Sequence, residues 1–314
     1  MVQILSSIDV FLKSGLVFSI LAMGYYVSYT VLDFPDLTVE GTFVTGAVTY
    51  GLLCHFGLNG WFALPIVCIM GSLFGCLTGI LNVKLKIRDL LCGILVSTSL
   101  ITLNLVMTST GMMGDLRGEQ SSTINLFNNP NTLHNSFPMK LIPAKLDVIS
   151  LRDILIFLIV VVIVKAVLDL FFKTKRGMLL RATGDNKTFV TTLSKDSGNM
   201  KILGLAIGNG CAALAGALYT TISGNVNQSM GLGTVVIGLA SLIIGLSVLN
   251  RVRFMAPTTK VIIGALLYQL ALTVAQKIGI PSAYNKLIMA VLFTLALVFS
   301  DKLKKKVGLR HAGT

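Results

Sequence analysis

The sequence predicts an all-α polytopic membrane protein with about nine transmembrane helices. Three observations lead to this fold class. Apolar residues make up 54% of the 314 residues, and only 12% are charged, which is about half the charged fraction of a soluble domain. The mean hydropathy is +0.82. Apolar runs of about 20 residues, the length that an α-helix needs to cross a bilayer, recur along the chain.

Hydropathy places the expected spans in order along a single transmembrane domain that covers residues 1–314. They lie near residues 10–32, 41–57, 61–82, 90–111, 152–172, 201–222, 232–249, 260–278 and 284–300. The first run has neither the basic flank nor the small-residue cleavage site of a signal peptide, so we interpret it as a span.

The basic residues predict the topology. The formal net charge is +13, but 18 of the 26 basic residues lie in four short segments: 84–88, 173–201, 251–260 and 302–310. Such segments between or after membrane helices remain in the cytoplasm. The C-terminus is therefore expected inside and the N-terminus outside, and the positive charge does not indicate a nucleic-acid partner.

Two connections are long enough to carry function outside the bilayer. Residues 113–150 are polar and form an expected extracytoplasmic loop, whereas residues 173–200 are basic and form an expected cytoplasmic segment.

A break is predicted between the first two spans, near residues 33–40. Pro35 lacks an N–H group and disfavours a helix at the preceding residue. Asp33, Asp36 and Glu40 lie here, although the whole chain has only 13 acidic residues. One interpretation is helix capping by Asp36 or Thr38, with Glu40 in the first turn. The other is a re-entrant or broken segment that forms a gate beside a pathway, because charges at bilayer depth are costly.

The chain also resembles itself. Residues 41–46 read Gly-Thr-Phe-Val-Thr-Gly, and residues 233–238 read Gly-Thr-Val-Val-Ile-Gly. Each stretch follows a short polar break, and the two lie an odd number of spans apart. They would therefore insert with opposite orientation, which predicts an inverted repeat of the kind found in transporters.

Uncharged polar residues within the spans give further pathway candidates. Asn104 and Asn209 are not easily satisfied in lipid and should face the bundle or a pore. Lys165 and Asp169 are four residues apart and are expected to pair on one helix near the cytoplasmic interface. The candidates for the pathway or gate are Asp33, Asp36, Thr38, Glu40, Asn104 and Asn209.

The residues do not indicate an enzyme, so the predicted catalytic residues are none. The chain has no G-x-x-x-x-G-K-[ST] motif, so ATP and Mg²⁺ would have to be bound by a partner chain. None of its five cysteines forms a C-x-x-C pair and its three histidines are scattered, so no metal site is predicted.

Three motifs carry a resemblance to a known family. They are Asp-Phe-Pro-Asp-Leu-Thr at 33–38, Arg-Ala-Thr-Gly-Asp-Asn at 181–186, and the segment 200–240, which includes Met-Lys-Ile-Leu-Gly-Leu-Ala and Met-Gly-Leu-Gly-Thr-Val-Val. Together they resemble permease subunits of bacterial ABC importers in the branched-chain amino acid/ribose superfamily, in particular the tryptophan/tyrosine-type branch. The resemblance covers nearly the whole chain.

The resemblance implies a set of partners in the bacterial inner membrane. These are two cytoplasmic ATPase subunits, a second permease copy or homologue, and an extracytoplasmic substrate-binding lipoprotein. It also implies that part of segment 173–200 is a coupling helix for the ATPase. Gly177 and Gly184 are expected to permit sharp turns at its ends. Lys187 and Ser194 depart from the family pattern. The expected coupling residues are Arg176, Gly177, Arg181, Ala182, Gly184, Asp185 and Asn186.

The expected function is therefore ATP-driven import of a small organic nutrient, such as an amino acid, by alternating access. The main alternative is a secondary transporter, which would need its own ion or proton site. An intramembrane enzyme would need a catalytic constellation that the sequence lacks. Neither alternative explains the Arg-Ala-Thr-Gly-Asp-Asn motif in a basic segment.

Overall fold

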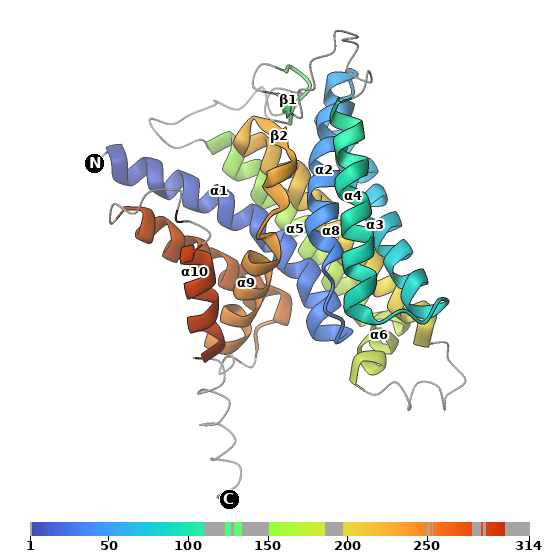
Figure 1. The fold of residues 1–314 in the computed structure, drawn as a ribbon. Coiled ribbons are helices and arrows are strands. Elements are labelled where there is room, and N and C mark those ends of the chain that lie inside the picture. The colour runs from blue at the N-terminus through green and yellow to red at the C-terminus, as the bar shows by residue number, and fades with distance from the viewer. Residues whose placement is uncertain are drawn as a thin grey trace, which may run out of the picture.

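The computed structural model describes residues 2–109, 123–126, 129–133, 151–185, 197–249, 252, 254–277, 284 and 287–298 (Figure 1). Its elements, in chain order, are α1 (Val2–Tyr25), the π-helix η1 (Tyr26–Val31), α2 (Thr38–His55), α3 (Gly60–Val83), α4 (Asp89–Ser109), β1 (Thr123–Asn125), α5 (Leu151–Lys173), α6 (Lys175–Asp185), α8 (Ser197–Ser223), β2 (Asn225–Asn227), the 3₁₀-helix η3 (Gln228–Gly231), α9 (Thr234–Val248), α10 (Pro257–Lys277) and a short helix, Leu287–Val298.

The all-α polytopic class is confirmed. Within the described residues, seven helical stretches are long and apolar enough to cross a membrane. In addition, α2 has 18 residues, nearly all of them buried, and the apolar helix Leu287–Val298 is shorter than a span. The helices follow the expected order, but the described residues establish seven long apolar spans and not nine.

Small residues bring α3 and α8 into close contact. Gly71, Gly75 and Gly79 of α3 face the backbone of α8 at Asn209, Leu205 and Ile202. A side chain at any of these three glycines would collide with α8. The four-residue spacing that places small residues on one helix face therefore serves helix packing, as it does in other membrane bundles.

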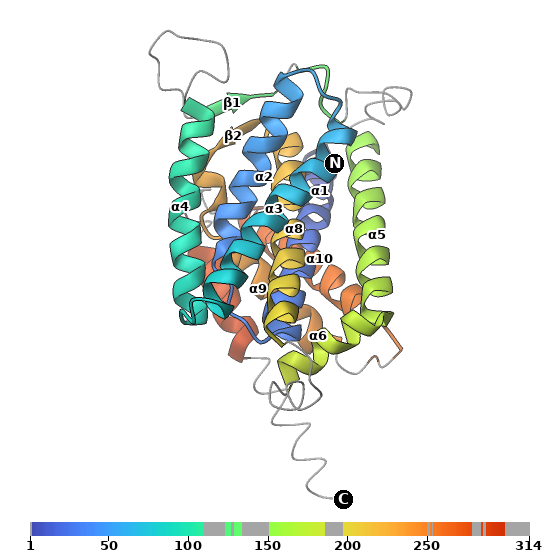
Figure 2. The ribbon, with the colours of Figure 1, turned by 90° about the vertical axis from the view of Figure 1, so that its right-hand side faces the viewer.

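The buried helix α2 packs against α8 in the same manner. Gly46 lies against the backbone of Ala213, and Gly216 lies against the carbonyl of Phe43. Since lipid provides no hydrophobic force between helices, this close van der Waals contact is the main source of attraction. Figure 2 shows α2, α3, α4 and α8 as one group of neighbouring helices.

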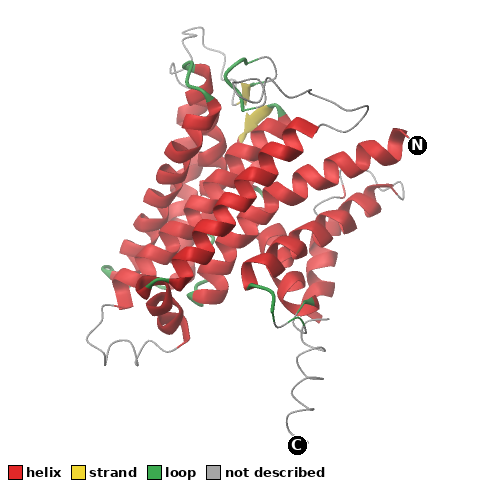
Figure 3. Cartoon of the chain, turned by 180° about the vertical axis from the view of Figure 1, so that it is seen from behind, coloured by secondary structure: helices red, strands yellow, loops and turns green. Residues whose placement is uncertain are grey.

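A second group contains α9 and α10, and α1 connects it to the first. Gly264 of α10 packs against Ser241 of α9, and Gly15 of α1 meets Leu266 of α10. Figure 3 shows α1 passing obliquely from the N-terminal end of the bundle toward the opposite end, so that it contacts α8 as well as α9 and α10.

The two ends of the bundle are different. At one end, β1 and β2 pair antiparallel, with Thr123 opposite Asn227, and cover Gly51 of α2 with Ile124 and Val226. At the other end lies α6 (Figure 1). Most of the expected loop 113–150 lies outside the described residues, as do Asn186 and the C-terminal segment 299–314.

Candidate gate and coupling site

The predicted break between the first two spans is present, but it is shorter than expected. The π-helix η1 leads into it, because Leu32 N donates to Val27 O at 3.1 Å and Phe34 N donates to Ser28 O at 2.9 Å. Asp33 then adopts a positive φ of 53°, which aspartate tolerates better than most residues. The irregular segment covers 32–37, and α2 begins at Thr38. The predicted break at 33–40 therefore wrongly included residues 38–40, which belong to the helix.

The carboxylate of Asp36 is buried at this break, with 2% of the residue exposed. One oxygen accepts the backbone N–H of Thr38 at 2.9 Å, and the other accepts the side-chain amide of Asn209 at 2.6 Å. Asp36 therefore caps α2, as one interpretation predicted, although the residue at the N-cap position is Leu37. Hydrogen bonds to a charged group contribute about 1.5–3 kcal/mol each, which offsets part of the cost of burial.

Asn209 extends this contact into a network across three helices. Its oxygen accepts the hydroxyl of Thr42 at 2.8 Å, and its amide also donates to Leu205 O at 3.0 Å. Thr38 does not cap the helix but shares a 2.8 Å hydrogen bond with Thr78 of α3. We call Asp36, Thr38, Thr42, Thr78 and Asn209 the buried polar network. It joins the break to α3 and α8.

Glu40 lies in the first turn of α2, as predicted, but its carboxylate interacts with a different helix. Its Oε1 accepts the N–H of Gly233 at 3.0 Å. Gly233 has a φ of 91° and is the N-cap residue of α9, which has no side-chain cap of its own. Gly231 also packs against the backbone of Glu40. The first turn of α2, just before the stretch 41–46, therefore contacts the beginning of the stretch 233–238; the inverted repeat itself stays a prediction.

The remaining two gate candidates lie apart from the network. Asn104 is fully buried on α4 and donates to Gly41 O at 3.3 Å, so it faces α2 within the bundle. Its carbonyl oxygen has no partner within the described residues. Asp33 is exposed and its carboxylate is not part of the network. Of the six gate candidates, four thus lie close together at the start of α2 and on the facing part of α8: Asp36, Thr38, Glu40 and Asn209. Asn104 contacts α2 from the neighbouring helix α4.

The expected coupling segment contains α6, and its two glycines serve a purpose different from the predicted one. Gly177 and Gly184 lie within the helix and not in sharp turns. Neither has a positive φ. Instead, Gly177 packs against the backbone of Phe171, and Gly184 packs against the carbonyl of Val31. The missing side chain at Gly184 allows α6 to touch the last residue of η1.

The helix α6 also carries exposed basic side chains. Arg176 and Arg181 are exposed, and the guanidinium of Arg181 lies 4.6 Å from the ring centroid of Phe172. Met178 lies between these arginines in sequence and is 56% exposed. Met178 was not identified from the sequence as a candidate contact residue. An apolar residue between two arginines in the expected coupling segment could have indicated it. Ala182 is half-buried, and Asp185 is the last residue of α6.

The expected ion pair on α5 is present and also connects two helices. Lys165 Nζ lies 2.6 Å from Asp169 Oδ2, and the hydroxyl of Thr258 donates to Asp169 Oδ1 at 2.6 Å. This contact joins the end of α5 near α6 to the beginning of α10. α10 therefore begins at the α6 end of the bundle, and α9 is the helix that precedes it in the chain, so α9 runs toward that end. In contrast, α2 follows the contact of Gly184 with Val31 and runs away from α6.

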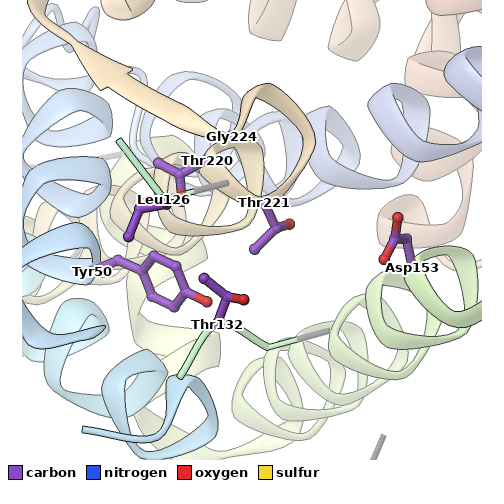
Figure 4. A pocket seen from close by; sticks show the side chains of 7 residues that line it. All are labelled: Tyr50, Leu126, Thr132, Asp153, Thr220, Thr221 and Gly224. Atoms are coloured by element: carbon purple, nitrogen blue, oxygen red, sulfur yellow. The ribbon is translucent and has the colours of Figure 1, made fainter. Parts of the chain in front are cut away.

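A small pocket of about 120 Å³ lies at the end of the bundle opposite α6 (Figure 4). Tyr50 and Thr132 line one side, and Asp153 lines the other. Asp153 is 3.2 Å from Lys13. This volume is well below the roughly 300 Å³ of a typical small-molecule site.

The whole sequence is similar to transport permeases. Residues 7–297 match the family model described as branched-chain amino acid transport system / permease component. A tyrosine transport system permease protein of Clostridioides difficile is 34% identical over 287 residues, which cover 91% of this chain and 89% of the relative. An uncharacterised protein of Rickettsia prowazekii is 31% identical over 91% of this chain and 95% of its own length.

A more distant relative is the autoinducer 2 import system permease protein LsrC of Escherichia coli, which is 26% identical over 93% of this chain and 78% of the relative. No solved structure matches the chain at a significant level. Both the family model and the first relative cover most of the chain. The chain therefore belongs to the branched-chain amino acid transport permease family and is a multi-pass membrane subunit of an ABC importer for small solutes.

Proposed function

We propose that this permease subunit moves an amino acid across the inner membrane when a separate ATPase pushes on α6. In this proposal the residues of the chain form one permease domain, two ATPase subunits bind ATP and Mg²⁺, and a second permease copy or homologue completes the pathway. A lipoprotein delivers the substrate at the β1–β2 end. The observation that carries the proposal is the contact of Gly184 with Val31, which joins α6 directly to the break before α2.

The exposed face of α6 supports the proposed docking of the ATPase. Arg176 and Arg181 can pair with carboxylates of a partner, and arginine does so with two hydrogen bonds. Met178 provides an adaptable apolar contact between them. Of the expected coupling residues, Arg176 and Arg181 therefore serve docking, while Gly177 and Gly184 hold α6 against the membrane helices.

The contacts beyond α6 support a route for the movement. Val31 ends η1, and η1 leads into the irregular segment 32–37 that carries Asp36. Asp36 is hydrogen-bonded to Asn209 in the middle of α8. A displacement of α6 would thus reach the buried polar network through the irregular segment 32–37, in which the N–H groups of Leu32 and Phe34 bond back to η1. π-Helical turns of this kind are common at functional sites.

A self-sufficient secondary transporter is less well supported. Such a transporter would need a carboxylate that can bind an ion or a proton, and Asp36 is the most deeply buried carboxylate of the gate candidates. Both of its oxygens already accept hydrogen bonds from the protein. Within the described residues, histidine, cysteine, aspartate and glutamate form no group of three or more that could hold a metal ion.

The direction of the chain in the membrane follows from the same proposal. If α6 meets a cytoplasmic ATPase, the β1–β2 end faces outward. The first residues of α1 are then outside, because Lys13 contacts Asp9 and also Asp153, near the outer end of α5. The basic C-terminal segment is placed in the cytoplasm by its charge.

Substitution of Met178 tests the docking surface. We expect Met178→Glu to lower the amount of ATPase that co-purifies with the permease at least about tenfold, because it removes the apolar contact and its carboxylate competes with carboxylates of the ATPase for Arg181, three residues away. Met178→Leu keeps the apolar contact and should leave co-purification unchanged. Equal ATPase recovery with all three proteins would contradict docking at this face.

Substitution of Gly184 separates docking from transmission. Gly184→Val places a side chain against the Val31 carbonyl and should push α6 away from η1. We expect the ATPase still to co-purify but ATP-driven uptake of labelled tyrosine into proteoliposomes to fall at least about tenfold. Leu170→Val, at a 64% exposed position on α5, is the control. Full uptake by Gly184→Val would remove this contact from the mechanism.

Substitution of Asn209 tests the buried polar network. Asn209→Leu removes the amide that holds Asp36 and leaves one carboxylate oxygen without its 2.6 Å partner, at a cost of about 1.5–3 kcal/mol. We expect tyrosine uptake to fall about tenfold or more in an assembled complex. Thr108→Val is the matched control, since this buried hydroxyl bonds only to its own helix. Unchanged uptake by Asn209→Leu would show that the network has no part in gating.

A further inference from the structure

The turn between α3 and α4, residues 84–88, carries three exposed cations. They are Lys84, Lys86 and Arg88. We call residues 84–88 the basic turn. Within the described residues, none of these three side chains forms an ion pair. The turn thus presents three positive charges for which the described part of the chain supplies no counter-ion.

The backbone of the basic turn is held in a fixed shape. The side-chain amide of Asn82 donates to Ile87 O at 2.8 Å and to Asp89 Oδ1 at 2.6 Å. Lys201 of α8 lies 3.6 Å from the same oxygen of Asp89, so this neighbouring carboxylate is already paired. Lys86 adopts a positive φ of 54°, which is uncommon for a residue with a side chain. Because the backbone is ordered, a ligand that binds the three cations has to order only their side chains.

The basic turn lies at the level of the lipid headgroups. The helices that it joins have 24 residues (α3) and 21 residues (α4), so they are about 36 Å and about 32 Å long. The hydrocarbon core of a bilayer is about 30 Å thick. Each helix therefore ends close to the edge of that core, and the short turn between them stays near the membrane surface. Figure 2 shows this turn at the same end of the bundle as α6 but on the other side of that end.

Apolar side chains beside the cations are also exposed. Leu85 lies between the two lysines and is 63% exposed. In the first turn of α4, Leu90 and Leu91 are 48% and 49% exposed, and the exposed apolar surface continues through Ile94 and Leu95. Leucines that adjoin the lipid-facing surface of a span, next to a row of cations, match the acyl chains and the phosphate of a phospholipid. This continuity with the lipid-facing surface favours a lipid over a second contact with the ATPase.

We propose that the basic turn binds the phosphodiester group of an anionic phospholipid, such as phosphatidylglycerol. Lys84, Lys86 and Arg88 hold the phosphate, and Leu85 contacts the acyl chains. The orientation in which α6 faces the cytoplasm assigns this lipid to the inner leaflet. The site goes beyond the proposed function, because it requires neither the ATPase nor the transported solute.

The lipid site is connected to the break before α2. Lys201 Nζ donates to Asn82 Oδ1 at 3.1 Å and lies 5.5 Å from the ring centroid of Phe34. Phe34 is buried within the irregular segment 32–37. A lipid on the basic turn therefore holds the end of α3 beside the segment that moves in the proposed mechanism.

The test is native mass spectrometry of the full-length permease, titrated with phosphatidylglycerol or with phosphatidylcholine of the same acyl chains. We expect phosphatidylglycerol to bind at least about tenfold more tightly, because the zwitterionic headgroup gains less from the cations. The triple variant Lys84→Gln, Lys86→Gln, Arg88→Gln should lose at least about tenfold in affinity for phosphatidylglycerol. Equal affinity of the wild type for the two lipids would overturn the inference.

A second triple variant is the matched control. Lys173→Gln, Lys175→Gln, Arg176→Gln also removes two lysines and one arginine from exposed positions at the α6 end. It should bind phosphatidylglycerol as the wild type does. An equal loss in both triple variants would show a response to net charge alone and would contradict a site at the basic turn. Lys84→Arg with Lys86→Arg keeps the charges and should keep the affinity, which separates the loss of cations from a loss of folding.

Co-purification distinguishes a lipid from a protein partner at the basic turn. The variant that lacks its three cations should retain the ATPase as the wild type does, because α6 is unchanged. Loss of the ATPase with unchanged affinity for phosphatidylglycerol would assign the turn to the ATPase and overturn the inference. Lipid binding is measured on the permease alone, so its failure leaves the proposed function standing. A wild-type chain that never retains an ATPase would refute the proposed function and not the lipid site.

Discussion

A buried carboxylate at a break between two membrane helices must find hydrogen-bond donors within the protein, and the arrangement around Asp36 meets this constraint. Its two oxygens accept from Thr38 N and from the Asn209 amide. Asn209 can reach Asp36 only because α8 lies against both α2 and α3, and that approach depends on glycines such as Gly71 and Gly216. The break, the network and the close helix packing therefore depend on one another.

Two helix N-termini, those of α2 and α9, also meet inside the bundle. Asp36 neutralises the positive end of α2, and Glu40 neutralises that of α9 by accepting from Gly233. Neither helix has a capping side chain at its own N-cap position. Because the carboxylate that neutralises α9 belongs to the first turn of α2, a movement of α2 at this point changes the contact at the N-terminus of α9. The π-helix η1 connects this junction to α6 through the contact of Gly184 with Val31.

Composition and hydropathy predict the class of the protein and the order of its helices, because lipid imposes a uniform requirement on every span. They also indicate the break, since Pro35 and three carboxylates are unusual within apolar sequence. The partners of those carboxylates could not be predicted. Glu40 binds Gly233, which is 193 positions away in sequence, and no periodicity reports such a contact. The role of Gly184 was also missed, because a glycine required for close approach looks the same in sequence as one required for a turn.

The most direct test of the account is whether α6 and the break move together when ATP is bound. Spin labels at Lys175, Asp33 and Lys86, three exposed positions, would report two distances in a variant that lacks the native cysteines and is assembled with its ATPase. The account predicts that the 175–33 distance stays constant while the 33–86 distance changes with ATP, because the break follows α6 and the end of α3 does not. A complex that hydrolyses ATP and drives uptake with the 33–86 distance unchanged would contradict it.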